Sequence, residues 1–327
     1  MKRRDVLKAL AGAAIVAPNS AVAQTAGKTY RVGTLTVGPP IPPTAGTGAM
    51  LIAGLAQRGF ILGKNLAYET RGAAGNDSQL ANLMQELKAA NVDAVVTVGY
   101  PSAMVAKASG VATVIAGGVG DAVKTGLVAS FARPGGTVTG ISEDNTTLST
   151  KRLGLLKATV PHLRLVAMLW NKDDLGMSQR YDASAQAAHD IAVTVLPLGV
   201  RQPDDFNEAF EAMDKNPPDA ILMVTDSLTN LNRKRVFEYA TAHRLPAIYE
   251  QDFIARDGGL MSYGPDAHET FDRAAALVAR IFQGGKPADL PFEIPTRYQF
   301  VINLKTAKAI GLEMPNNVLA LADEVIE

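Results

Sequence analysis

The chain has 327 residues, with 32 basic and 32 acidic side chains and no cysteine. The absence of cysteine excludes disulfides, thiol catalysis and cysteine-ligated zinc, and the balanced charge gives no basic stripe for a nucleic-acid partner. A chain of this length usually forms two domains with substantial hydrophobic cores.

The first 23 residues have the pattern of an export signal. Arg3 and Arg4 precede a short apolar run at 9–17, and Ala21-Val22-Ala23 has the small-x-small form of a cleavage site. The arginine pair favours the twin-arginine route, and the apolar run is far shorter than the roughly 20 residues of a membrane-spanning helix. We therefore expect cleavage near Ala23 and a periplasmic protein; the alternative is an uncleaved N-terminal anchor.

From residue 30 onward, short apolar segments alternate with amphipathic ones. The apolar segments are bounded by Gly, Pro, Asn or Asp, as buried strands are; they are Tyr30–Thr36, Ala94–Val98, Ala112–Ile115, Leu165–Trp170, Val193–Leu198, Ala220–Val224 and Ala247–Tyr249. Helical spacing of apolar residues predicts helices at Ser78–Ala90, Asn232–His243 and Ala267–Gln283. The alternation predicts an α/β protein with parallel sheets that carry helices on both faces.

The alternation comes in two blocks, at about 30–141 and 151–262, followed by a long helix and a strand at Arg297–Asn303. The turn-rich segment 133–140 could carry a crossover strand, and at 258–266 a further strand runs into a turn. This order predicts two Rossmann-like lobes joined by a hinge of three crossovers, near 138–145, 262–267 and 300–306. The predicted N-terminal lobe comprises 29–140 plus about 264–300, and the C-terminal lobe comprises 141–263 plus about 301–327.

No motif for catalysis or metal binding is complete. Gly118–Thr125 approximates a phosphate-binding loop, but Val123 stands where that loop needs its second glycine. Neither a G-x-S-x-G nor an H-E-x-x-H motif occurs, and the four histidines lie in or beside predicted helices. We therefore expect a protein that is not an enzyme and that uses no cofactor and no metal.

Polar and aromatic residues follow the predicted strands of both blocks, which is where open α/β sheets bind ligands. The candidate ligand-binding residues are Thr36, Tyr100, Ser102, Asp121, Trp170, Asn171, Asp226, Ser227, Tyr249 and Gln251. Helix capping is an equal alternative for Ser102, Asp121 and Ser227, and core packing is one for Tyr100 and Trp170.

The chemistry of these candidates fits a small polar molecule with an apolar or aromatic part. Tyr100 offers a ring for stacking, Asp226 accepts from an ammonium group, and Asn171 both donates and accepts. The helix start after Ser102 offers backbone N–H groups to a carboxylate.

Several segments resemble the ABC transporter substrate-binding proteins of the tryptophan/tyrosine uptake type. They are Thr125–Gly136, Lys151–Lys157, Val160-Pro161, Val166–Asn171, Arg244–Tyr249, Gly258–Pro265, Lys286–Pro291 and Val301–Lys308. The resemblance covers nearly all of the chain after residue 23 and implies the type I periplasmic-binding-protein fold, whose two lobes close on a ligand. Two segments depart from the family pattern, namely the proline-rich segment 38–43 and Gln251-Asp252. The ligand of any single relative therefore does not transfer directly.

The residues and the resemblance together predict an extracytoplasmic solute-binding protein of an ABC importer. Its ligand would be an amino acid or related carboxylate, with aromatic ones favoured by the resemblance, and its partners a permease and ATPase at the inner membrane. One alternative is an extracytoplasmic sensor that signals through a membrane receptor. Another is an exported enzyme on a similar frame, for which no converging nucleophile and base are found.

Overall fold

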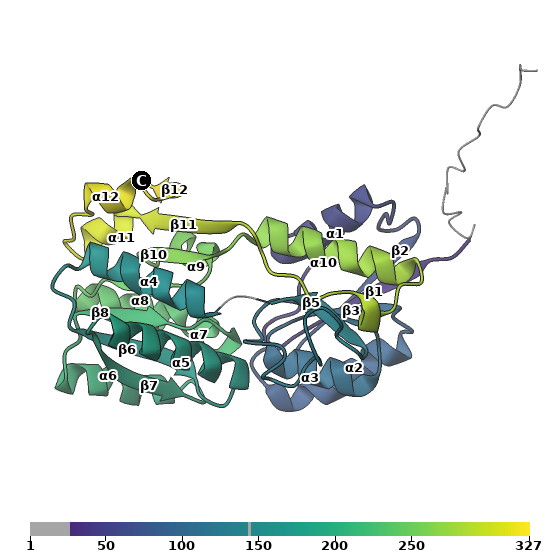
Figure 1. Cartoon of the computed structure of the whole chain (residues 1–327), viewed down its shortest axis with the longest axis horizontal. Coiled ribbons are helices and arrows are strands. Elements are labelled where there is room, and N and C mark those ends of the chain that lie inside the picture. Colours follow the sequence, from purple (N-terminus) through teal and green to yellow (C-terminus); the bar gives the residue numbers. More distant parts are fainter. Residues whose placement is uncertain (1–26, 143–144) are drawn as a thin grey trace, which may run out of the picture.

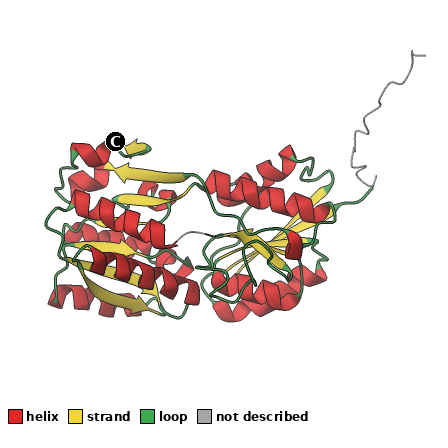
Figure 2. Cartoon of the chain, in the orientation of Figure 1, coloured by secondary structure: helices red, strands yellow, loops and turns green. Residues whose placement is uncertain are grey.

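The computed structural model describes residues 27–142 and 145–327, which form two α/β lobes side by side (Figures 1 and 2). The predicted export signal at 1–23 lies outside the described residues and stays a prediction. In the described part of the chain, no helix combines the length and apolar character needed to cross a membrane.

The first lobe is built on a five-stranded parallel sheet with the order β2-β1-β3-β4-β5. Its strands are β1 (Tyr30–Thr36), β2 (Leu66–Gly72), β3 (Ala94–Val98), β4 (Thr113–Ala116) and β5 (Val138–Ile141). Its helices are α1 (Gly46–Gln57), α2 (Leu80–Ala89), α3 (Tyr100–Ser109) and, from much later in the chain, α10 (Ala267–Phe282). Helix α10 lies against α1, and its apolar face joins one core with β1, β3 and β4 (Figure 1).

The second lobe is built on a seven-stranded sheet with the order β12-β11-β10-β9-β8-β6-β7. Its strands are β6 (Leu165–Asn171), β7 (Thr194–Val200), β8 (Ala220–Met223), β9 (Ala247–Tyr249), β10 (Met261–Pro265), β11 (Tyr298–Asn303) and β12 (Glu324–Ile326). Its helices are α4 (Asn145–Thr159), α5 (Leu175–Asp190), α6 (Asp205–Lys215), α7 (Ser227–Leu231), α8 (Arg233–Ala242), α9 (Asp252–Arg256), α11 (Leu304–Ala309) and α12 (Asn316–Leu319). Strands β10 and β11 are antiparallel, and the other pairs are parallel.

Side-chain caps fix where several helices begin. Asp174, Asp226, Asp266 and Asn303 each accept a hydrogen bond from a backbone N–H group in the first turn of α5, α7, α10 and α11. A cap of this kind satisfies one of the backbone donors that a helix start leaves free. Asp174, Asp226 and Asp266 follow strands β6, β8 and β10, and Asn303 is the last residue of β11, so the caps hold these helix starts at the ends of the strands.

The predicted fold class is confirmed: two α/β lobes with predominantly parallel sheets. Three features differ from the expectation. Strands β2 and β12 have no counterpart in the predicted list, and the β10–β11 pair is antiparallel where a parallel sheet was expected.

The chain passes between the two lobes three times. It leaves the first sheet after β5, returns between β10 and α10, and leaves again after Glu293, which still pairs with Ile141 of β5. The last passage therefore precedes Tyr298, where β11 begins, and lies before the expected 300–306. The predicted boundaries of the two lobes as domains stay a prediction.

Candidate functional site

A cavity of about 770 Å³ lies between the two lobes. The first lobe lines it with the segments that follow β1, β2, β3 and β4, and with the first turn of α10. The second lobe lines it with the segments that follow β6, β7, β8 and β9. The cavity therefore joins the carboxyl ends of parallel strands from both sheets, where α/β proteins bind ligands.

The structure brings five of the ten candidate residues into the cavity wall: Thr36, Asn171, Asp226, Ser227 and Gln251. The Asn171 side-chain amide donates to Oδ2 of Asp226 at 2.7 Å, which ties the end of β6 to the end of β8. Oδ1 of Asp226 accepts from the backbone N–H of Thr229 at 2.8 Å, so Asp226 also caps α7. Asp226 therefore both caps a helix and lines the cavity. Ligand contact by the five residues stays a prediction.

Ser102 and Asp121 lie outside the cavity wall, and their side chains form hydrogen bonds with the backbone. The buried Ser102 hydroxyl donates to the carbonyl of Val98 at 2.7 Å. Oδ1 of Asp121 accepts from the N–H groups of Val123 and Lys124 at 2.9 and 3.1 Å. The helix start beside Ser102 also offers fewer donors than expected, because Pro101 stands at its second position.

The three aromatic candidates also lie outside the cavity wall, and each packs against the protein. Trp170 stacks on Tyr181, with 3.7 Å between ring centroids. Tyr249 is buried edge-on against Phe237, and Tyr100 packs beside the first-lobe core. These three rings do not line the cavity, and ligand contact by them stays a prediction.

The cavity floor holds a buried charge network that the sequence reasoning missed. Glu250 receives hydrogen bonds from Arg152 at 2.8 Å and from Arg180 at 2.6 Å, and all three side chains are almost fully buried. Arg152 also donates to the carbonyl of Tyr263 in β10, and the backbone N–H of Thr225 donates to Glu250. Burial alone would raise the pKa of Glu250, but the two guanidinium groups lower it below its ordinary value. No sequence signal predicts this network, because its members lie on α4, α5 and the end of β9.

Three further carboxylates, Asp77 of the first lobe and Asp174 and Asp226 of the second, give the cavity wall negative charge. Burial, and then the charge of Asp226, raises the pKa of Asp174 to about 7, although its carboxylate accepts from the Met177 N–H. The same two causes raise the pKa of Asp77. Within residues 27–142 and 145–327, none of the three forms an ion pair with a basic side chain. A cationic group of a ligand would relieve the mutual repulsion of these carboxylates.

Two buried polar atoms of the wall have no hydrogen-bond partner within the described chain: the Thr225 hydroxyl and the Asn230 side-chain oxygen. Thr225 is only 4% exposed. Leaving a buried polar group unsatisfied typically costs about 1–3 kcal/mol, so a polar ligand group at this wall would gain from pairing with them.

Other parts of the wall are apolar. Phe253 and Leu231 of the second lobe are large apolar side chains that stay more than one-third exposed at the cavity. On the first-lobe side, Pro39 and Ile41 of the proline-rich segment 38–43 line the cavity. Tyr68 donates to the carbonyl of Ile41 at 2.9 Å and so fixes this segment beside β2.

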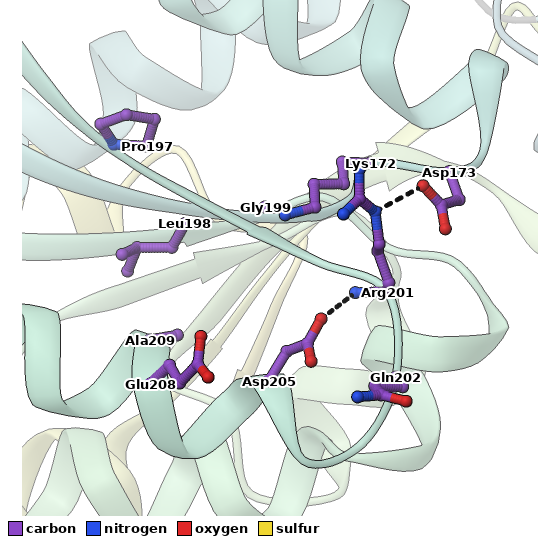
Figure 3. A pocket seen from close by; sticks show the side chains of 10 residues that line it. All are labelled: Lys172, Asp173, Pro197, Leu198, Gly199, Arg201, Gln202, Asp205, Glu208 and Ala209. Atoms are coloured by element: carbon purple, nitrogen blue, oxygen red, sulfur yellow. Dashed lines mark hydrogen bonds and ion pairs between the residues drawn. The ribbon is translucent and has the colours of Figure 1, made fainter.

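A second, smaller pocket of about 650 Å³ lies on the second lobe between β7, α6 and the end of β6 (Figure 3). Its lining includes Lys172 and Glu208, and it shares Asp173, Arg201 and Gln202 with the main cavity. Arg201 donates to Asp173 at 2.8 Å, so this exposed ion pair lies at the boundary of the two spaces (Figure 3).

The family model described as "ABC transporter substrate binding protein" matches residues 46–326. A curated relative, the "Tyrosine-binding protein" of Clostridioides difficile, is 23% identical over 263 residues, which are 80% of this chain and 75% of that protein. These findings confirm the resemblance inferred from the sequence.

Two solved structures share the fold over 91% of this chain and 100% of theirs, each with a TM-score of 0.84. One is a conserved domain protein from Vibrio cholerae, 22% identical. The other is an ABC domain from Streptococcus pneumoniae in complex with L-tryptophan, 23% identical.

Proposed function

The chain belongs to the family of ABC transporter substrate binding proteins, and we propose that it binds an amino acid, preferably an aromatic one, in the cavity between its lobes. The observation that carries the proposal is a cavity lined by the strand ends of both sheets. Three carboxylates of its described wall form no ion pair with a basic side chain. A ligand that touches both lobes favours the arrangement in which the lobes lie together.

The wall has a group for each part of such a ligand. Asp226, supported by Asp77 and Asp174, would accept from the ammonium group. The hydroxyls of Thr225 and Ser227 would donate to the carboxylate. The apolar side chain would lie against Phe253 and Leu231. The tyrosine and tryptophan named for two of the relatives support an aromatic side chain at this place.

Calorimetric titration of the purified protein tests this assignment. L-tryptophan and L-tyrosine are expected to bind, and indole-3-propionate, which lacks the ammonium group, is expected to bind much more weakly than L-tryptophan. Tryptamine, which lacks the carboxylate, separates the contribution of the hydroxyl groups. The proposal is contradicted if no amino acid binds, or if indole-3-propionate binds as tightly as L-tryptophan.

We further propose that the protein acts outside the cytoplasm and delivers its ligand to an ABC permease and its ATPase. Its family and the binding proteins among its structural relatives support this role. Uptake of radiolabelled L-tryptophan by cells with and without the gene tests it, with a plasmid copy as control. If cells without the gene lose uptake and the plasmid restores it, the protein serves an importer. If these cells take up L-tryptophan as before, although the purified protein binds it, a sensor is favoured.

A further inference from the structure

The two lobes meet beside the cavity at a pair of glycines, Gly120 of the first lobe and Gly176 of the second. Gly120 lies in the segment after β4, and Gly176 lies in the first turn of α5. Their neighbours Gly118 and Met177 line the cavity. We propose that this contact sets how closely the lobes approach over the ligand, and that only residues without a Cβ permit the close approach. The proposal rests on the binding function proposed above.

The distances leave no room for a side chain at either position. A Cβ on Gly176 would lie 2.8 Å from the carbonyl carbon of Val119 and 2.9 Å from its oxygen. A Cβ on Gly120 would lie 2.7 Å from the Gln179 side-chain oxygen and 2.9 Å from Cα of Gly176. Most of these atoms are backbone, so a methyl group could be accommodated only by moving the lobes apart.

Hydrogen bonds hold both sides of the contact in place. The backbone N–H of Asp121 donates across the lobes to the Gln179 side-chain oxygen at 2.9 Å. The Ser142 hydroxyl donates to the carbonyl of Gly120 at 2.9 Å, and Ser142 directly follows β5, where the chain first leaves the first lobe. The glycine contact therefore lies next to a passage between the lobes, where a small displacement is amplified across the cavity.

Gly176 is the position at which the contact can be tested without disturbing the fold of its own lobe. Alanine is the better helix former, so Gly176→Ala should leave the second lobe as stable as before, or more stable. Gly120 has a φ of +69°, where any side chain is strained, so a change there would mix two effects. Gly154 in α4 provides a matched control, because a Cβ there would meet no atom within 4 Å.

A disulfide trap measures the approach of the lobes without any ligand. A Cβ on Gly38 of the first lobe would lie 3.6 Å from the hydroxyl of Ser227 of the second, close enough for Gly38→Cys and Ser227→Cys to cross-link when the lobes meet. Because the chain has no cysteine of its own, this is the only disulfide that can form within one molecule. Gly176→Ala is expected to slow cross-linking about tenfold or more, and Gly154→Ala is expected to leave its rate unchanged. Equal rates in all three backgrounds overturn the proposal.

Two further measurements separate this proposal from the proposed function. In the protein without added cysteines, Gly176→Ala is expected to weaken L-tryptophan binding about tenfold or more while its ligand-free melting temperature stays the same or rises. A fall in that melting temperature overturns the proposal, because the contact would then support folding and not closure. If L-tryptophan and L-tyrosine do not bind the unaltered protein, the choice of ligand fails, and the cross-linking rates still decide the role of the glycines.

Discussion

At the scale of single residues, Asp226 has two roles that one substitution can separate. It caps α7 through the N–H of Thr229, and it presents charge to the cavity beside Asn171. Asparagine caps a helix about as well as aspartate, but it carries no charge. Its amide would face the Asn171 amide, and a turn of the Asn171 amide would restore this hydrogen bond while giving up the exposed one from the Asp173 N–H.

Asp226→Asn is therefore expected to keep the melting temperature nearly unchanged and to weaken L-tryptophan binding. Loss of a desolvated charge partner typically costs on the order of 2–5 kcal/mol, which is roughly 30- to several-thousand-fold in affinity. Calorimetric titration beside a melting curve measures both quantities. Asp266→Asn at the cap of α10, outside the cavity lining, is the matched control and should bind normally. Normal binding by Asp226→Asn as well would remove Asp226 from the site.

The raised pKa of Asp174 predicts how stability changes with pH. Its folded-state pKa of about 7 lies above the ordinary 3.8, so between these values the folded protein keeps a proton that the unfolded chain has lost. The stabilising contribution is therefore present at acidic pH and is lost as the pH rises through about 7. Asp174→Asn keeps the cap and stays neutral. Urea denaturation should show the unaltered protein losing about 2 kcal/mol more than the variant between pH 5.5 and 8.5. Parallel pH profiles would contradict this reading.

Ligands of α/β proteins bind at the carboxyl ends of strands, and this expectation needs only the local sequence. It placed five of the ten candidate residues correctly in the cavity wall. The local sequence does not show toward which side of the sheet a side chain points. Tyr249 is buried, and Trp170 stacks on Tyr181. The Arg152–Glu250–Arg180 network needs three distant segments to meet, which no spacing in one sequence reveals. Buried charge of this kind requires the tertiary structure.

At the scale of elements, most central strands were predictable, whereas two edge strands, β2 and β12, were not. Strands β1, β3 and β9 match the predicted ranges because they are short, mostly buried segments bounded by turn residues or charged residues. Strand β2 lies at an edge and carries Glu69 and Arg71, so its apolar signal is weak. Strand β12 has only three residues. The antiparallel β10–β11 pair follows from the chain returning from the first lobe, which local sequence does not encode.

Helix α10 is expected to stabilise the first lobe although it follows most of the second lobe in the sequence. Leu277 is fully buried in the first-lobe core, so Leu277→Ala should lower the free energy of unfolding by about 2–5 kcal/mol. Hydrogen exchange should show the loss of protection in β1, β3 and β4. Leu321→Ala, at a side chain that is 54% exposed, should change stability by less than about 0.5 kcal/mol. Loss of protection confined to the second lobe would refute the assignment of α10.

At the scale of the whole molecule, ligand binding should bring the lobes together, since both line one cavity and three passages of chain connect them. Small-angle scattering is expected to give a smaller radius of gyration with saturating L-tryptophan than without it. Asp226→Asn at the same ligand concentration serves as the control. An unchanged radius in a protein that calorimetry shows to be saturated would indicate a rigid receptor.

The interleaved order of the two lobes has a consequence for how the protein is made. The sheet of the first lobe is complete at Ile141, but its covering helix α10 ends only at Phe282. The second-lobe core in turn needs Phe300 of β11 and Val318 of α12. A nascent chain leaving the ribosome therefore exposes apolar surface of both lobes until nearly all of it has been synthesised. The lobes reach their native cores almost together, so a chain arrested before residue 282 should be a substrate for chaperones and proteases and not a half-assembled receptor.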